Sequence, residues 1–164
     1  MDKANTENDR KYIWDYFQMH ASQRLATFNF YIVLSTLLVT GLFTVLKGDF
    51  QIPYVGIILG FLLILFSFLF WKLDMRNQTF IKNAESALKY IEHQKGLNCL
   101  KGEPHALMIF SREEYLTNLS QNNKSFWPWK KYYSYSKCFI IIFVSFGILG
   151  IFGTILAIKN CFIH

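Results

Sequence analysis

The chain has 164 residues, of which 52% are hydrophobic and 18% aromatic, and its formal net charge is +6 at pH 7. Three nearly uncharged runs take up about 60 residues, which leaves a polar remainder shorter than an ordinary enzyme domain. The sequence has no paired-carboxylate, nucleophile, phosphate-loop or metal-ligand motif, so we expect neither an enzyme nor a cofactor site.

The three apolar runs, at residues 28–46, 53–72 and 138–158, predict three membrane-spanning helices. Each run has about 20 residues, the length that an α-helix needs to cross the hydrocarbon core with its backbone hydrogen bonds satisfied inside the segment. The fold class that we expect is therefore an all-α membrane protein.

The first two spans should be parts of longer helices. No Gly or Pro falls between Asp9 and Gly41, and no further Pro falls between Pro53 and Gly96. We expect a long antiparallel helical hairpin with cytoplasmic extensions, plus a third transmembrane helix. In chain order the hairpin consists of an N-terminal cytoplasmic helix (1–27), the first span (28–46), an outer loop (47–52), the second span (53–72) and its cytoplasmic extension (73–95).

Opposite charges should face one another in this hairpin. Residues at equal height have numbers that sum to about 98, because both helices rise about 1.5 Å per residue from a turn near residue 49. The facing pairs are Arg24 with Asp74, Asp15 with Lys82, Lys11 with Glu85, and Asp9 with Lys89. Each exposed pair contributes only about 0–1 kcal/mol, but the set can fix the register. Coincidence between two polar helix faces is the alternative.

Residues 96–137 form a cytoplasmic insert before the third span. Ser111 to Glu114 fit a capping box that begins a short helix ending near Leu119. Aromatic rings and cations follow, in an arrangement typical of an anchor at the lipid headgroups. The anchor residues are Trp127, Trp129, Lys130 and Lys131.

The positive charges are unevenly distributed. Eleven of the 17 Lys and Arg residues lie in 72–137 and four in 1–27, whereas the outer loop and the tail at 159–164 hold one each. By the positive-inside rule, the N-terminus and residues 73–137 are cytoplasmic and the C-terminus lies on the other side. The charge therefore predicts topology and contact with anionic lipid, and we expect no direct nucleic-acid binding.

The first span carries a polar stripe made of Asn29, Thr36, Thr40 and Thr44, which lie within about 80° of one another at 100° per residue. Polar groups in a span face protein or water rather than lipid. Two interpretations are open: the stripe lines a pore shared by several identical subunits, or it forms hydrogen bonds between packed helices.

Small residues mark one face of the second span and one face of the third. Small side chains allow helix backbones to approach closely, so we interpret both faces as assembly surfaces, in contacts either within a chain or between chains. The two sets are Gly56, Gly60 and Ser67, and Gly147, Gly150 and Thr154.

Three segments of residues 12–92 carry a resemblance to known proteins: Trp14–Arg24 with the Phe28-Asn29-Phe30 that follows, Leu73–Asn77, and Ala84–Glu92. They resemble a group of small bacterial membrane proteins that includes RipA-type octameric membrane proteins, retron transmembrane effectors and CRISPR-associated membrane pores. The third span is a departure from two-span members of this group. The group's junction motif corresponds to Gln23, Arg24, Asp74, Arg76 and Asn77, and we place His20, one turn before Arg24, at the same junction.

The resemblance implies a homo-oligomer in the bacterial inner membrane, and in that membrane the positive-inside rule places the C-terminus in the periplasm. It also implies a toxin-like effector of an antiphage defence system, which permeabilises or depolarises the membrane and causes abortive infection. A sensor complex, such as a reverse transcriptase with its noncoding RNA and DNA, would hold the effector silent. The alternative from another functional class is a non-conducting membrane adaptor that anchors a cytoplasmic complex through the insert at 96–137.

Overall fold

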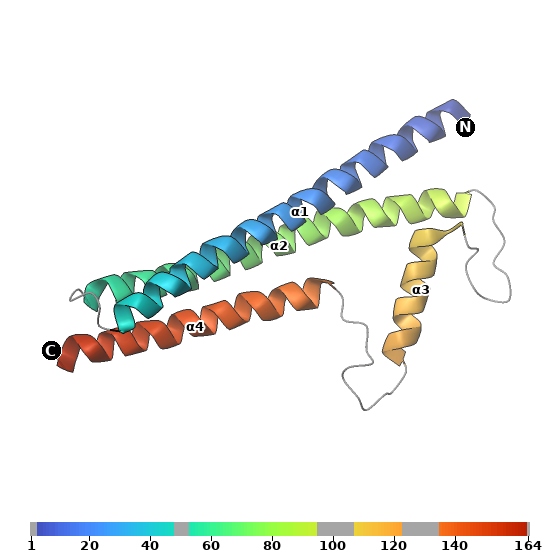
Figure 1. The fold of residues 1–164 in the computed structure, drawn as a ribbon. Helices are drawn as coiled ribbons and strands as arrows, with labels where there is room; N and C mark the ends of the chain where they lie inside the picture. Colours follow the sequence, from blue (N-terminus) through green and yellow to red (C-terminus); the bar gives the residue numbers. More distant parts are fainter. Residues whose placement is uncertain (1–2, 48–52, 95–106, 123–134, 164) are drawn as a thin grey trace. The chain divides into compact units, whose positions relative to one another are not determined.

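The computed structural model describes residues 3–47, 53–94, 107–122 and 135–163, and every regular element in these ranges is an α-helix (Figure 1). The helices are α1 (Lys3–Leu46), α2 (Pro53–Gln94), α3 (Ile109–Asn122) and α4 (Tyr135–Ile163). Three of them, α1, α2 and α4, are long and apolar enough to cross a membrane. The predicted fold class, an all-α membrane protein with three long apolar helices, is confirmed.

Helices α1 and α2 are much longer than a membrane span. Their 44 and 42 residues correspond to about 65 Å of helix at 1.5 Å per residue, roughly twice the thickness of the hydrocarbon core. Each helix therefore continues beyond the membrane, as the uninterrupted sequence predicts. α1 begins at Lys3, within the N-terminal helix predicted at residues 1–27.

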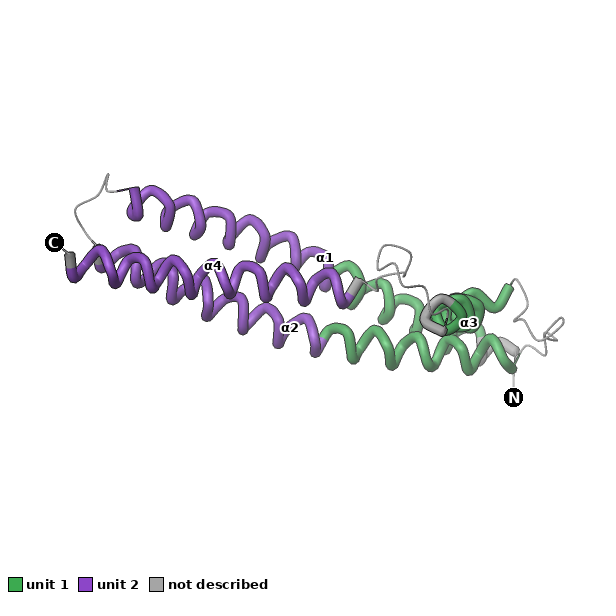
Figure 2. The backbone as a smooth tube through the Cα atoms, turned by 90° about the horizontal axis from the view of Figure 1, so that it is seen from below, with its two compact units in different colours: residues 1–22, 77–134 green, residues 23–76, 135–164 purple. Residues whose placement is uncertain are grey.

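Two compact units divide the chain, and Figure 2 colours them separately. Unit 1 comprises Met1–Ser22 and Asn77–Ser134, and unit 2 comprises Gln23–Arg76 and Tyr135–His164. Unit 2 thus contains all three predicted spans, whereas unit 1 contains most of the two helical extensions and α3.

Aromatic packing holds α4 against α1 in unit 2. Tyr31, Phe139 and Phe143 form a buried cluster, and the rings of Phe28 and Phe139 stack in parallel with their centroids 3.8 Å apart. Lipid tails are as apolar as these side chains, so close packing, rather than removal from water, stabilises the contact between spans. The third span is therefore an integral part of this helix bundle.

Small residues bring the backbones of α2 and α4 together. A Cβ atom added at Gly150 would lie 3.0 Å from the carbonyl oxygen of Gly60 and 2.9 Å from Cγ1 of Ile64, so neither side chain nor backbone leaves room for it. The other facing pairs are Gly60 with Thr154, Gly56 with Ala157, and Gly147 with Ser67. The two small-residue faces that the sequence predicts thus meet each other within one chain.

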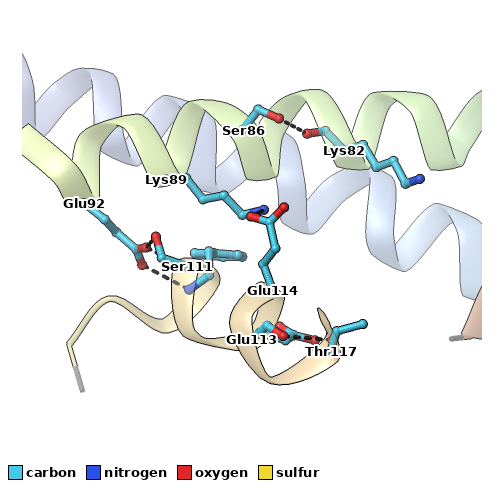
Figure 3. A network of polar contacts seen from close by, with 9 residues as sticks. Lys82, Ser86, Lys89, Glu92, Ser111, Glu113, Glu114 and Thr117 are labelled. Carbon is cyan, nitrogen blue, oxygen red and sulfur yellow. Dashed lines mark hydrogen bonds and ion pairs between the residues drawn. The ribbon is translucent and has the colours of Figure 1, made fainter. Parts of the chain in front are cut away.

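In unit 1, α3 packs against the extensions of α1 and α2. The ring of Phe110 makes edge contacts with those of Trp14 and Phe17, at centroid distances of 6.4 and 5.6 Å. Nζ of Lys89 on α2 forms an ion pair with Glu114 of α3 at 2.7 Å (Figure 3). One aromatic cluster and one ion pair therefore hold α3 to its neighbours, together with a helix cap.

The first turn of α3 is capped by a side chain from α2. The amide and hydroxyl of Ser111 donate to the carboxylate of Glu92 at 3.2 and 3.0 Å, and the amide of Phe110 donates to it at 3.2 Å (Figure 3). A carboxylate satisfies free amides at this end of a helix and interacts favourably with its dipole. The capping-box prediction is wrong, because α3 begins at Ile109, which places Ser111 inside the helix.

Candidate pore-lining face and buried junction

The polar stripe of α1 lies on the surface of unit 2. Asn29, Thr36 and Thr40 are exposed and Thr44 is half-buried. Within residues 7–46, the buried residues of α1 are Tyr31, Ser35 and Leu42. These point roughly 155° away from the stripe at 100° per residue, and two of them, Tyr31 and Leu42, face α4. The stripe therefore occupies the side of α1 that α4 leaves open.

The other two spans expose almost purely apolar faces. Between Val55 and Leu69, every exposed side chain of α2 is apolar. Between Ile140 and Ile158, Ser145 is the one exposed polar side chain of α4. Lipid accepts apolar side chains, whereas polar ones face protein or water. Among the described parts of the three spans, α1 thus has the most polar outward face.

The threonine hydroxyls of the stripe are bonded within α1. Thr36, Thr40 and Thr44 donate to the carbonyl oxygens four residues earlier, at 2.7, 2.8 and 3.0 Å. A hydroxyl has one proton to donate and two lone pairs, so each oxygen still offers acceptor sites to the surroundings. Within the described chain the stripe makes no hydrogen bond to another helix. The stripe can therefore still contact water or a second subunit.

A buried ion pair connects the three helices of unit 2. Nε of Arg24 donates to Oδ1 of Asp74 at 2.6 Å, and its Nη2 donates to Oδ2 at 3.0 Å. The same Nη2 donates to Oγ of Ser136 on α4 at 3.1 Å, and the guanidinium lies 4.9 Å from the ring centroid of Phe139. The side chains of Arg24 and Asp74 are only 11% and 6% exposed. The pair predicted from the hairpin register forms, with two additional partners from α4.

The rest of the predicted charge ladder does not form. Among the described residues, Lys89 pairs with Glu114 of α3 rather than with Asp9. Within that part of the chain, no ion pair joins Asp15 to Lys82 or Lys11 to Glu85. Of the four predicted pairs, the buried pair of Arg24 and Asp74 is therefore the one that the described hairpin contains.

The other predicted junction residues fall in both units. Gln23 and Arg76 are exposed in unit 2, and Asn77 is half-buried in unit 1. The ring of His20 in unit 1 contacts those of Tyr16 and Phe80, at centroid distances of 4.3 and 4.9 Å. His20 is therefore part of an aromatic contact, whereas Arg24 belongs to the ion-pair cluster.

Tyr31 is a buried polar residue that the sequence analysis missed. It is fully buried in unit 2, and its hydroxyl lies 2.9 Å from Oγ of Ser67. Ser67 donates to the carbonyl oxygen of Leu63 at 2.8 Å, so Tyr31 is the donor in the contact between α1 and α2. The sequence feature that could have indicated this contact is a tyrosine inside the apolar run 28–46, because a polar group in lipid requires a hydrogen-bond partner.

The predicted interface anchor, Trp127, Trp129, Lys130 and Lys131, lies outside the described residues. A cluster of the same chemistry is present at the end of the second predicted span. Nζ of Lys72 lies 5.0 Å from the ring centroid of Trp71 and 5.8 Å from that of Phe68. A lysine that bends over aromatic rings at the end of an apolar run is typical of the membrane interface.

The sequence of this chain is similar to those of known proteins. The model of the octameric membrane protein family (8xMP) matches residues 8–159, which include most of α4. The chain is also 36% identical over 141 residues to CD-NTase-associated protein 19 of Escherichia coli, which covers 86% of this chain and 85% of that protein. No solved structure matches it. The family match covers all three spans, and the chain belongs to the octameric membrane protein family.

Proposed function

We propose that this protein is an effector of an antiphage defence system, which assembles as a homo-oligomer and permeabilises or depolarises the bacterial inner membrane to cause abortive infection. Membership of the octameric membrane protein family supports both the membrane location and homo-oligomerisation. The relative from Escherichia coli is named for its association with a CD-NTase. A CD-NTase system is therefore the sensor that this comparison favours, in place of the reverse transcriptase that the resemblance implies.

The observation that carries the proposal is the polar outward face of α1. One chain with three spans cannot enclose a channel, so a water-filled path needs α1 from several subunits around a common axis. The stripe from Asn29 to Thr44 is about 22 Å long at 1.5 Å per residue, which covers most of the hydrocarbon core. Because α4 covers the opposite side of α1, the stripe is free to face such an axis while α2 and α4 face lipid.

Energetics favour this orientation over one with α1 facing lipid. Moving an unpaired amide such as that of Asn29 from water into hydrocarbon costs several kcal/mol. The threonines cost less there, because their protons already bond α1 carbonyl oxygens. An axis lined by α1 leaves the Asn29 amide with water or a neighbouring subunit and avoids the cost.

The test is a double substitution, Thr36→Leu with Thr40→Leu, in purified protein reconstituted in liposomes that contain a small dye. We expect the variant to lose dye release and, in cells, toxicity on overexpression, while its membrane level stays normal. Ser145→Leu is the matched control, because Ser145 also donates to the carbonyl oxygen four residues earlier, at 2.8 Å, but lies on the apolar face of α4. Full killing by the double variant would exclude the α1 face from the pathway.

A specific observation favours a second function, a non-conducting adaptor for a cytoplasmic complex. One face of α3 carries exposed large apolar side chains that are spaced for a helix, namely Ile109, Leu116 and Leu119. Such a stripe can take up a partner helix or protein. The liposome assay separates the two functions, since an adaptor releases no dye with any of the variants above.

A further inference from the structure

A lysine continues the polar stripe of α1 at its C-terminal end. Lys47 follows Asn29 by 18 residues, which is about five complete turns at 3.6 residues per turn, so both side chains leave the helix in nearly the same direction. Thr36 and Thr40 lie about 20° to either side of that direction. The amide of Lys47 donates to the carbonyl oxygen of Phe43 at 3.1 Å, so the backbone still follows the helix there. Lys47 is exposed.

The charge of Lys47 has no described counter-charge in unit 2. Residues 25–46 contain no charged side chain. Asp74 is the one carboxylate among the described residues of unit 2, and both of its oxygens are bonded to Arg24. Along the described stripe, the full charge therefore lies at one end, while the rest is lined by an amide and three hydroxyls.

We propose that Lys47 makes the pathway selective for anions, an inference that rests on the proposed pore function. A homo-oligomer repeats Lys47 around the axis, and a ring of ammonium groups at a pore mouth attracts anions and repels cations. The threonine oxygens present lone pairs, which favour cations, but they carry only partial charges. A ring of full charges outweighs these dipoles because charge–charge interactions are stronger and act over a longer range.

The experiment measures reversal potentials of the purified protein in planar bilayers or liposomes under a tenfold KCl gradient. We expect chloride to be more permeable than potassium in the wild-type protein. Lys47→Gln should bring the permeability ratio toward unity, Lys47→Glu should reverse the preference, and Lys47→Arg should preserve it. Raising the ionic strength should weaken the preference, since salt screens exposed charges.

Lys159→Gln is the matched control. Like Lys47→Gln, it removes one positive charge. Lys159 lies at the same end of the bundle as Lys47, since Gly153 of α4 faces Leu42 of α1 near that end. Lys159 is exposed on α4 rather than on the polar face of α1. The reversal potential of this variant should equal that of the wild-type protein.

The possible failures are distinguishable. Absence of current from the wild-type protein contradicts the proposed pore function itself. Current with the same reversal potential in Lys47→Gln as in the wild-type protein overturns the assignment of Lys47 and leaves the pore intact. A shift in Asp49→Asn without one in Lys47→Gln also overturns it, because the loop carboxylate would then select the ion.

Discussion

The contacts within unit 2 differ in kind from the contacts within unit 1. In unit 2 the polar contacts are buried, as in the pair of Arg24 and Asp74, and helix backbones meet at glycines. In unit 1 the ion pair that attaches α3 is more exposed, with Lys89 and Glu114 side chains 24% and 57% accessible. Buried bidentate pairs fix one geometry, whereas exposed pairs contribute little. Unit 2 is therefore expected to resist rearrangement, and α3 is expected to detach at low cost.

The largest effect is expected from breaking the buried pair in unit 2. Asp74→Ala leaves the guanidinium of Arg24 buried with only Ser136 and the ring of Phe139 as described partners, and it should destabilise the protein by about 3–5 kcal/mol. Thermal unfolding in detergent measures the loss. Arg24→Leu combined with Asp74→Leu removes both charges and should be much milder. A single variant as stable as the wild-type protein would contradict the role of the pair.

A smaller but position-specific effect is expected where α2 meets α4. Gly150→Ala places a methyl group 2.9–3.0 Å from Ile64 and from the Gly60 backbone, and overpacking of this kind costs about 1–3 kcal/mol. Gly147→Ala is the control on the same face, because its methyl group would lie 3.7 Å from Cβ of Ser67, an ordinary contact. Equal melting temperatures for the two variants would show that α2 and α4 are not packed as described.

In unit 1, removal of the cap should loosen α3 alone. Glu92→Ala frees the amides of Phe110 and Ser111, and loss of a cap costs about 0.5–2 kcal/mol. Hydrogen exchange should therefore accelerate in residues 109–122 and stay unchanged in unit 2. Glu7 is an exposed acid on α1, and Glu7→Ala should leave hydrogen exchange unchanged both in residues 109–122 and in unit 2. Faster exchange in unit 2 as well would show that Glu92 stabilises more of the protein than α3.

These contrasts also explain how far the sequence could predict the fold. The spans and the long hairpin follow from local properties, namely the length of apolar runs and the absence of helix breakers. The Arg24–Asp74 pair follows from helix rise alone, because the loop between α1 and α2 is short. Contacts of α3 and α4 depend on where longer connections place those helices, so Ser136 as a partner of Arg24 and Glu92 as a cap were not predictable.

The small-residue faces illustrate the same limit. Glycines at helical spacing indicate that another backbone approaches, but not which backbone. The sequence left open whether Gly60 and Gly150 pack within a chain or between chains, and the structure places them opposite each other in one chain. The polar stripe of α1 differs, because its exposed side chains make no hydrogen bond to another described helix. Their partner is therefore expected outside the chain, in water or in a second subunit.

The smallest expected effect concerns pH and the docking of α3. Burial raises the pKa of Glu85, on the α2 extension, above its ordinary value, and the acidic Glu113 and Glu114 of α3 add to the rise while Lys89 and Lys82 oppose it. The docked state therefore binds a proton more tightly than the detached state, in which Glu113 and Glu114 no longer lie near Glu85. Between the ordinary and the raised pKa the docked state holds more protons, so docking strengthens as the pH falls through that window.

Hydrogen exchange of residues 109–122, corrected for the intrinsic pH dependence of exchange, measures this effect. Protection should rise on acidification and level off once the pH is below the ordinary pKa of a glutamate. Glu85→Gln should give higher protection at pH 7 and a weaker pH dependence, because the amide carries no charge to desolvate. Protection that falls on acidification would contradict this role of Glu85, and α3 would then be held mainly by charge contacts such as the ion pair of Lys89 with Glu114.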